Sequence, residues 1–150
     1  MYKISFIHRV TKFLVDFMFF GGIVMCIAFP FVLPWIDERY AFSIAWTRPS
    51  AAVVLAAGVC AVYILYQLRS MFKTLIGKTP FVHQNVSCFR KCGVASFIVS
   101  LLFVIRSVLW FTFGSAIIVV IFAMLGLFSL TMKDVFKQAV FYKEENDWTV

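Results

Sequence analysis

Long stretches of the chain contain no charged side chain, and their lengths match the thickness of a membrane. Residues 17–36 and 49–68 hold no Asp, Glu, Lys or Arg, and residues 92–132 hold one charge, Arg106. A bilayer crossing needs about 20 apolar residues in a helix that rises about 1.5 Å per residue. The third stretch is long enough for two crossings joined by a tight turn. The pattern therefore predicts four membrane-spanning helices.

These runs predict an all-α integral membrane protein in which four helices form an up-down bundle. We expect one domain, residues 1–150, because four crossings use about 80 residues and leave short connections. Pro30 and Pro34 are expected to kink or close the first span, so that residues 36–49 form an outer loop. The spans are expected at about residues 13–35, 50–70, 92–111 and 115–132.

The helix of the fourth span is expected to continue out of the membrane. Met132, Val135, Phe136, Ala139 and Val140 fall on one face of such a helix, and polar residues fall on the others. This apolar stripe suits a docking surface for a partner. The alternative is that it packs on the connection before the third span in the same molecule.

The positively charged residues are unevenly distributed between the two sides of the predicted spans. Arg39, Arg48 and Arg106 fall on one side of the predicted spans, and the other eleven of the 14 Lys and Arg residues fall on the opposite side. By the positive-inside rule this predicts that both termini are cytoplasmic. The net charge of +7 is thereby explained without direct nucleic-acid binding. The eleven are Lys3, Arg9, Lys12, Arg69, Lys73, Lys78, Arg90, Lys91, Lys133, Lys137 and Lys143.

Two charges fall inside the expected spans, Asp16 and Arg106, and intramembrane charges are candidates for function. The simpler interpretation places each near a membrane surface. Asp16 would pair with Lys12 one turn away, and Arg106 would extend its side chain to the outer headgroups. A small proton-coupled exporter needs a carboxylate deeper in its first span than Asp16.

The predicted spans contain no recognisable set of catalytic residues. The spans hold no Ser-His-Asp, Cys-His or paired-carboxylate set, so we expect no enzyme and no cofactor. Cys88 and Cys92 with His83 are too few ligands to indicate a metal site. Ala57 and Ala61 lie one turn apart on the second span, and this small-residue face predicts close helix association, in the chain or in a homo-oligomer.

Two segments carry distinctive motifs. The first is Gly77-Lys78-Thr79-Pro80-Phe81, followed by Asn85, Phe89-Arg90 and Gly93. The second is Val135-Phe136-Lys137-Gln138-Ala139 with the acidic ending at residues 144–150. In these motifs, and in span number and chain length, the chain resembles a bacterial family of small four-span membrane proteins of unknown function. The resemblance implies the bacterial cytoplasmic (inner) membrane, little chemistry, and a small helix-turn-helix regulator of the Cro/repressor type as a partner.

The first functional hypothesis is a non-enzymatic inner-membrane protein with a regulatory or scaffolding role. Its loop 71–91 and tail 133–150 would bind a cytoplasmic regulator or another membrane subunit. A small transporter or channel, and an immunity protein against a membrane-active peptide, stay open as alternatives. The candidate interaction residues are Gly77, Phe81, Asn85, Arg90, Val135, Phe136 and Val140.

Overall fold

A computed structural model of the protein describes residues 6–40, 44–76, 83–109 and 111–148. They form four long helices, and each is long and apolar enough to cross a membrane, so the predicted all-helical membrane fold is confirmed. Each predicted span lies within one helix, except at the end of the third, where the helix stops at Leu109. The helices are α1 (Phe6–Tyr40), α2 (Ile44–Ile76), α3 (His83–Leu109) and α4 (Phe113–Trp148).

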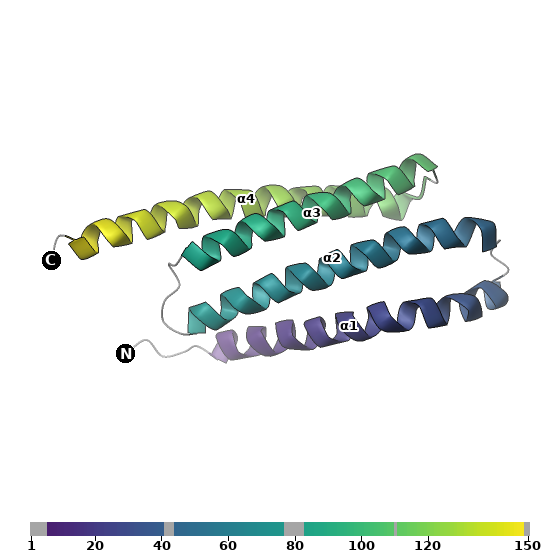
Figure 1. The fold of residues 1–150 in the computed structure, drawn as a ribbon, viewed down its shortest axis with the longest axis horizontal. Helices are drawn as coiled ribbons and strands as arrows, with labels where there is room; N and C mark the ends of the chain where they lie inside the picture. The colour runs from purple at the N-terminus through teal and green to yellow at the C-terminus, as the bar shows by residue number, and fades with distance from the viewer. Residues whose placement is uncertain (1–5, 41–43, 77–82, 110, 149–150) are drawn as a thin grey trace.

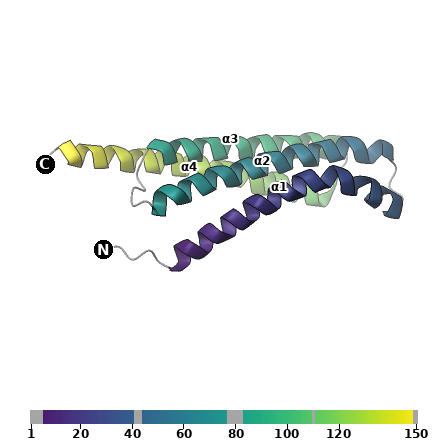
Figure 2. The same ribbon diagram turned by 60° about the horizontal axis from the view of Figure 1, so that its bottom comes forward.

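The four helices run alternately up and down (Figure 1). The start of α1, the end of α2, the start of α3 and the end of α4 lie at one end of the bundle, which we call the basal end; the opposite end is the distal end. At the basal end α4 projects past the other three helices (Figures 1 and 2). Both ends of the described chain therefore lie at the basal end of the bundle.

Each helix packs against its neighbours in sequence. The α3–α4 contact is the most extensive, followed by α2–α3 and then α1–α2. In the most apolar part of α3, 39% of the residues are buried, whereas none is buried in the corresponding part of α1. Figure 2 shows the start of α1 leaning away from α2. Helix α3 is thus central to the bundle, and α1 is attached at its edge.

Small residues bring α3 and α4 together. A Cβ atom added to Gly93 would lie 3.1 Å from the side chain of Leu130, and one added to Gly126 would lie 3.0 Å from the ring of Phe97. Because lipid is as apolar as a side chain, membrane helices associate by such close packing and not by a hydrophobic drive. The two glycines therefore set the distance between these helices.

Serine side chains add polar contacts along the same seam. The hydroxyl of Ser100 donates to the carbonyl oxygen of Val119 at 3.1 Å, and the hydroxyls of Ser107 and Ser115 are 2.7 Å apart. Both contacts connect α3 to α4. Bonds of this kind fix the register of two helices inside a membrane.

The core at the α2–α3 contact is made of two small clusters. Ala57 of α2 packs with Val99 and Phe103 of α3. Ile64 packs with Cys92 and Ala95. Ala57, expected on a small-residue face for close association, is therefore used within the chain, and Ala61 beside it is half-buried. A homo-oligomer through this face stays a prediction.

The predicted outer loop at residues 36–49 is wrong over most of its length. Helix α1 continues through Pro30 and Pro34 to Tyr40, and α2 begins at Ile44. Each proline removes one backbone donor, but a membrane helix tolerates this because lipid supplies no other partner to the backbone and any alternative structure would leave more groups unpaired. The connection outside the helices is correspondingly short.

Candidate functional site

The basal end of α4 continues as helix beyond the apolar stretch of its span. Helix α4 is 36 residues long, about 54 Å at the usual rise per residue, whereas the hydrocarbon core of a bilayer is about 30 Å thick. Its first charge is Lys133. We call residues 83–91 of α3 and 133–146 of α4 the basal platform.

The apolar stripe of the platform packs on α3. The rings of Phe89 and Phe136 have centroids 4.9 Å apart. His83 Nε2 lies 3.0 Å from Glu144 Oε1, two turns farther out. Val140, between these contacts, is 2% exposed. The stripe could either bind a partner or pack within the molecule. Phe136 and Val140 pack within the molecule, so little of either side chain is left for a partner.

Other apolar side chains of the platform remain exposed. Val135, the third stripe residue predicted to bind a partner, is exposed, and so are Phe141 and Tyr142 on the following turns. Phe141 and Tyr142 could not be predicted from the apolar stripe, because they fall off that face of the helix. Exposed large apolar residues beyond a membrane span are candidates for a protein interface.

Asn85 holds α3 to α2 and does not face outward. Its side chain is 0% exposed, and its Oδ1 lies 2.8 Å from the hydroxyl of Thr74, which is also 2.7 Å from the carbonyl oxygen of Met71. One residue earlier, Gln84 donates to the Ser70 hydroxyl at 3.2 Å. Gly77 and Phe81, predicted to contribute to the same loop, lie outside the described residues.

A basic pocket of about 320 Å³ opens where α3 and α4 meet in the platform. Arg90 and Lys137 are exposed at this pocket, and Lys133 Nζ lies 3.0 Å from Asp134 Oδ1. One carboxylate thus faces three permanent cations, so the pocket favours anions. Its lining residues are His83, Val86, Ser87, Arg90, Lys133, Asp134 and Lys137.

Asp16 pairs with a residue of another helix. Its Oδ1 lies 2.7 Å from Arg69 Nε on α2, although this contact lacks hydrogen-bond geometry, and the Arg69 guanidinium also stacks near the rings of Phe19 and Phe20. The expected partner, Lys12, is replaced because α2 brings a guanidinium to the same level. That level is basal and polar, since the neighbour of Arg69, Ser70, contacts the first turn of α3.

Arg106 lies in the last turn of α3, at the distal end, far from Asp16. Its guanidinium carbon is 6.0 Å from the centroid of the Phe103 ring. The Nε atom of Arg106 is buried and makes no hydrogen bond within the described part of the chain. The two charges singled out in the sequence therefore lie at opposite ends of the bundle and do not form one site.

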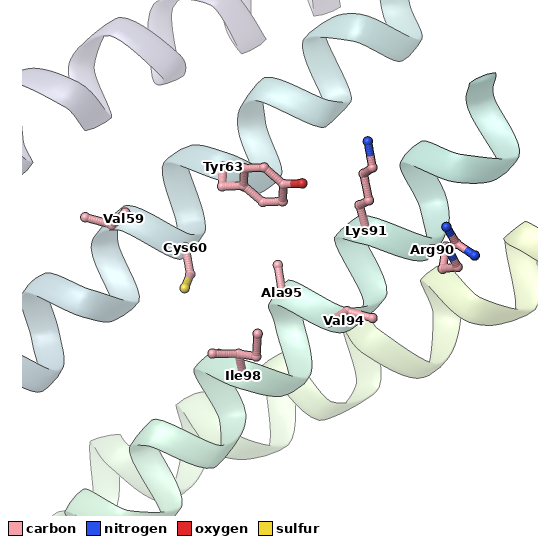
Figure 3. Close-up of a pocket in the computed structure, with 8 residues that line it drawn as sticks. All are labelled: Val59, Cys60, Tyr63, Arg90, Lys91, Val94, Ala95 and Ile98. Carbon is pink, nitrogen blue, oxygen red and sulfur yellow. The ribbon is translucent and has the colours of Figure 1, made fainter.

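An apolar groove of about 410 Å³ runs between α2 and α3 from the basal end (Figure 3). Ala95 and Ile98 of α3 line one side of it. The Tyr63 ring extends from α2 toward α3, with its hydroxyl on the side of Lys91 (Figure 3). This groove could not be predicted from the sequence, because its residues come from two separate helices. They are Val59, Cys60, Tyr63, Arg90, Lys91, Val94, Ala95 and Ile98.

Metal-binding geometry is not found in the described part of the chain, where no group of three His, Cys, Asp or Glu side chains converges. Cys88 and Cys92 are buried free thiols on α3. The thiol of Cys92 is 4.0 Å from the carbonyl oxygen of Ile64, which makes it part of the α2–α3 packing.

Comparison with known proteins gives one match. Residues 33–150 match the family described as "Protein of unknown function (DUF2975)". This range is more than half of the chain and includes the whole basal platform and the α2–α3 groove. No curated protein and no solved structure matches the chain significantly.

Proposed function

The chain belongs to the DUF2975 family of proteins of unknown function, and from this premise we propose that it is a non-enzymatic membrane scaffold. Its basal platform binds a soluble regulator or another membrane subunit. The observation that supports this most is that α4 is longer than a bilayer is thick, is fixed to α3 by the Phe89–Phe136 and His83–Glu144 contacts, and still exposes large apolar side chains.

The platform combines two kinds of surface. Val135, Phe141 and Tyr142 offer apolar contact, and Arg90 and Lys137 offer positive charge. A partner with an apolar patch bordered by acidic residues complements it. The positive-inside distribution supports a cytoplasmic platform, and the resemblance noted above makes a small helix-turn-helix regulator the first partner to test.

Site-specific photocrosslinking in native membranes tests this proposal. A crosslinker at position 141 should give one defined adduct, and Val135→Ser, Phe141→Ser and Tyr142→Ser together should abolish capture by an affinity-tagged chain. The matched control is Gln138→Ala with Lys143→Ala, which changes exposed polar side chains of the same helix segment. Equal recovery of the partner by the triple variant and by the unchanged protein would contradict the proposal.

A small transporter is the second candidate, and Arg106 favours it. The Arg106 Nε is buried and has no hydrogen-bond partner among the described residues, which is costly inside a span unless the guanidinium has a use, such as binding an anion. Flux measurements in proteoliposomes test this with Arg106→Gln and Asp16→Asn. If the unchanged protein transports a solute and both variants transport it equally well, a role of these charges in transport is excluded.

A further inference from the structure

The α2–α3 groove differs in chemistry along its length. At its basal rim lie Arg90 and Lys91, both exposed. Deeper along the groove the lining is apolar, from Val94 to Ile98 on α3. Figure 3 shows Lys91 and the Tyr63 hydroxyl on the same side of the groove mouth, and Arg90 directed toward α4. The groove thus has a cationic mouth and an apolar interior.

The position of the groove matches the boundary of a bilayer. Lys91 directly precedes the charge-free run of α3 that extends to Arg106. On α4 the corresponding first charge is Lys133, and the packing of Gly93 against Leu130 places the two lysines at similar depth. Ile98 lies seven residues beyond Lys91, about 10 Å deeper into the hydrocarbon. The cations are at headgroup level and the groove extends inward.

We propose that this groove is a binding site for one anionic phospholipid. Its phosphate is held by Lys91 and the Tyr63 hydroxyl, with Arg90 adding positive charge, and one acyl chain lies along Val59, Val94 and Ile98. A volume of about 410 Å³ is within the range of about 300–1,000 Å³ that small-molecule sites occupy. Basic pockets between membrane helices are suited to lipid headgroups.

Charge complementarity favours an anionic lipid over a zwitterionic one as the ligand of the groove. The eight residues that line the groove include two cations and no carboxylate. Arg90 also lines the basic pocket on the other side of α3, together with Lys133 and Lys137. The carboxylate of that pocket, Asp134, pairs with Lys133. The positive potential at the groove mouth is therefore not cancelled locally.

Native mass spectrometry of the full chain from detergent tests the headgroup. The probes are phosphatidylglycerol and phosphatidylcholine with identical acyl chains. We expect one phosphatidylglycerol bound more tightly than phosphatidylcholine, and about fivefold weaker binding for each of Lys91→Gln and Arg90→Gln. The control variant, Lys12→Gln with Lys143→Gln, removes two exposed cations elsewhere at the basal end and should bind as the unchanged protein does. Equal affinity for both lipids, or no loss in the groove variants, overturns the proposal.

The apolar half of the site needs a separate variant. Val94→Trp fills the groove and should weaken phosphatidylglycerol binding by at least about tenfold, whereas Val104→Trp, at an exposed α3 position outside the groove, should not. Glycerol phosphate, which has the anionic headgroup without acyl chains, should compete poorly. Effective competition by glycerol phosphate or by inorganic phosphate would show a simple anion site and overturn the lipid assignment. Circular dichroism establishes that each variant is folded.

Arg90 belongs to both sites, so Arg90→Gln does not separate the two proposals. Lys91→Gln and Val94→Trp leave Val135, Phe141 and Tyr142 unchanged, and the platform variants leave Lys91 and Val94 unchanged, so these variants separate lipid binding at the groove from partner binding at the platform. Failure of one proposal therefore does not imply failure of the other.

Discussion

In the α3–α4 hairpin, glycines pack against large side chains, serines make polar contacts along the seam, and both helices continue together into the basal platform. In the α1–α2 hairpin, Gly22 and Gly58 also permit close approach, and a partly exposed ion pair lies across the contact. The most apolar part of α1 contains no buried residue, against 39% in α3. The two halves of one chain therefore use different means to associate in lipid.

The difference in packing between the two hairpins indicates which helices determine the stability of the bundle. Lipid gives apolar helices no hydrophobic drive to associate, so the hairpin with close packing and interhelical hydrogen bonds is the rigid one. That hairpin carries the basal platform and one wall of the α2–α3 groove. Helix α1 contributes mainly apolar surface that faces outward, such as Phe13, Phe17 and Phe31. Substitutions in α3 should accordingly affect stability far more than matched substitutions in α1.

The largest expected effect follows from adding volume at the α3–α4 seam. Gly93→Val should lower the free energy of unfolding by about 1–3 kcal/mol, because its Cβ would lie 3.1 Å from Leu130 and 3.3 Å from the carbonyl oxygen of Gly126, a backbone atom that cannot rotate away. The matched variant is Gly21→Val in α1, where nothing lies within 4 Å of the added Cβ. Unfolding in mixed detergent measures both.

A larger loss at Gly21 than at Gly93 would reverse the comparison between the hairpins. It would indicate that α1 is covered in the membrane, by lipid or by another chain, more tightly than its contacts with α2 suggest.

The next effect concerns the polar contact that joins the two hairpins. Asn85→Ala should cost about 1–2 kcal/mol, because a fully buried amide that faces Thr74 is lost, whereas Thr74 keeps the carbonyl oxygen of Met71 as an acceptor. A double-mutant cycle with Thr74→Val isolates the contact. No coupling between the two substitutions would mean that Asn85 is held by other neighbours and does not join α2 to α3.

The sequence predicted what local patterns determine. Charge-free runs located all four spans, since a crossing needs a fixed length of apolar helix. The stripe through Val135 and Val140 predicted the extension of α4. Whether that stripe packs or docks could not be predicted, because an amphipathic pattern specifies an apolar face and not what covers it. The structure covers Val140 with the rest of the chain.

Contacts between segments that are far apart in the chain could not be predicted from local sequence patterns. Asp16 was expected to pair with Lys12 because four residues separate them on one helix, but its partner is Arg69 on α2. The α2–α3 groove was missed for the same reason: Tyr63 and Lys91 become neighbours through helix packing alone. The prolines of α1 misled the prediction of the outer loop, because rules from soluble proteins overestimate their effect in lipid.

A smaller effect is expected for the serine contacts of the α3–α4 seam. Ser100→Ala removes a hydrogen bond to the carbonyl oxygen of Val119 and should cost about 0.6 kcal/mol, the average for interhelical bonds in a membrane. Ser96→Ala is the control, because that hydroxyl donates within its own helix, to Cys92. Detergent-induced unfolding should separate the two, and an equal loss at both would assign the effect to volume and not to the interhelical bond.

The smallest effect is expected at the ion pair of the α1–α2 hairpin. The side chains of Arg69 and Asp16 are 41% and 26% exposed, so water and headgroups screen the attraction that their 2.7 Å separation would otherwise give. A double-mutant cycle with Asp16→Asn and Arg69→Gln should yield about 0.2–0.5 kcal/mol and should shrink as salt is added. A coupling well above about 1 kcal/mol that resists salt would place the pair in a region without water. Asp16 would then be an intramembrane charge after all, the loosely packed hairpin would hold the more functional element, and transport would gain over scaffolding as the role to test.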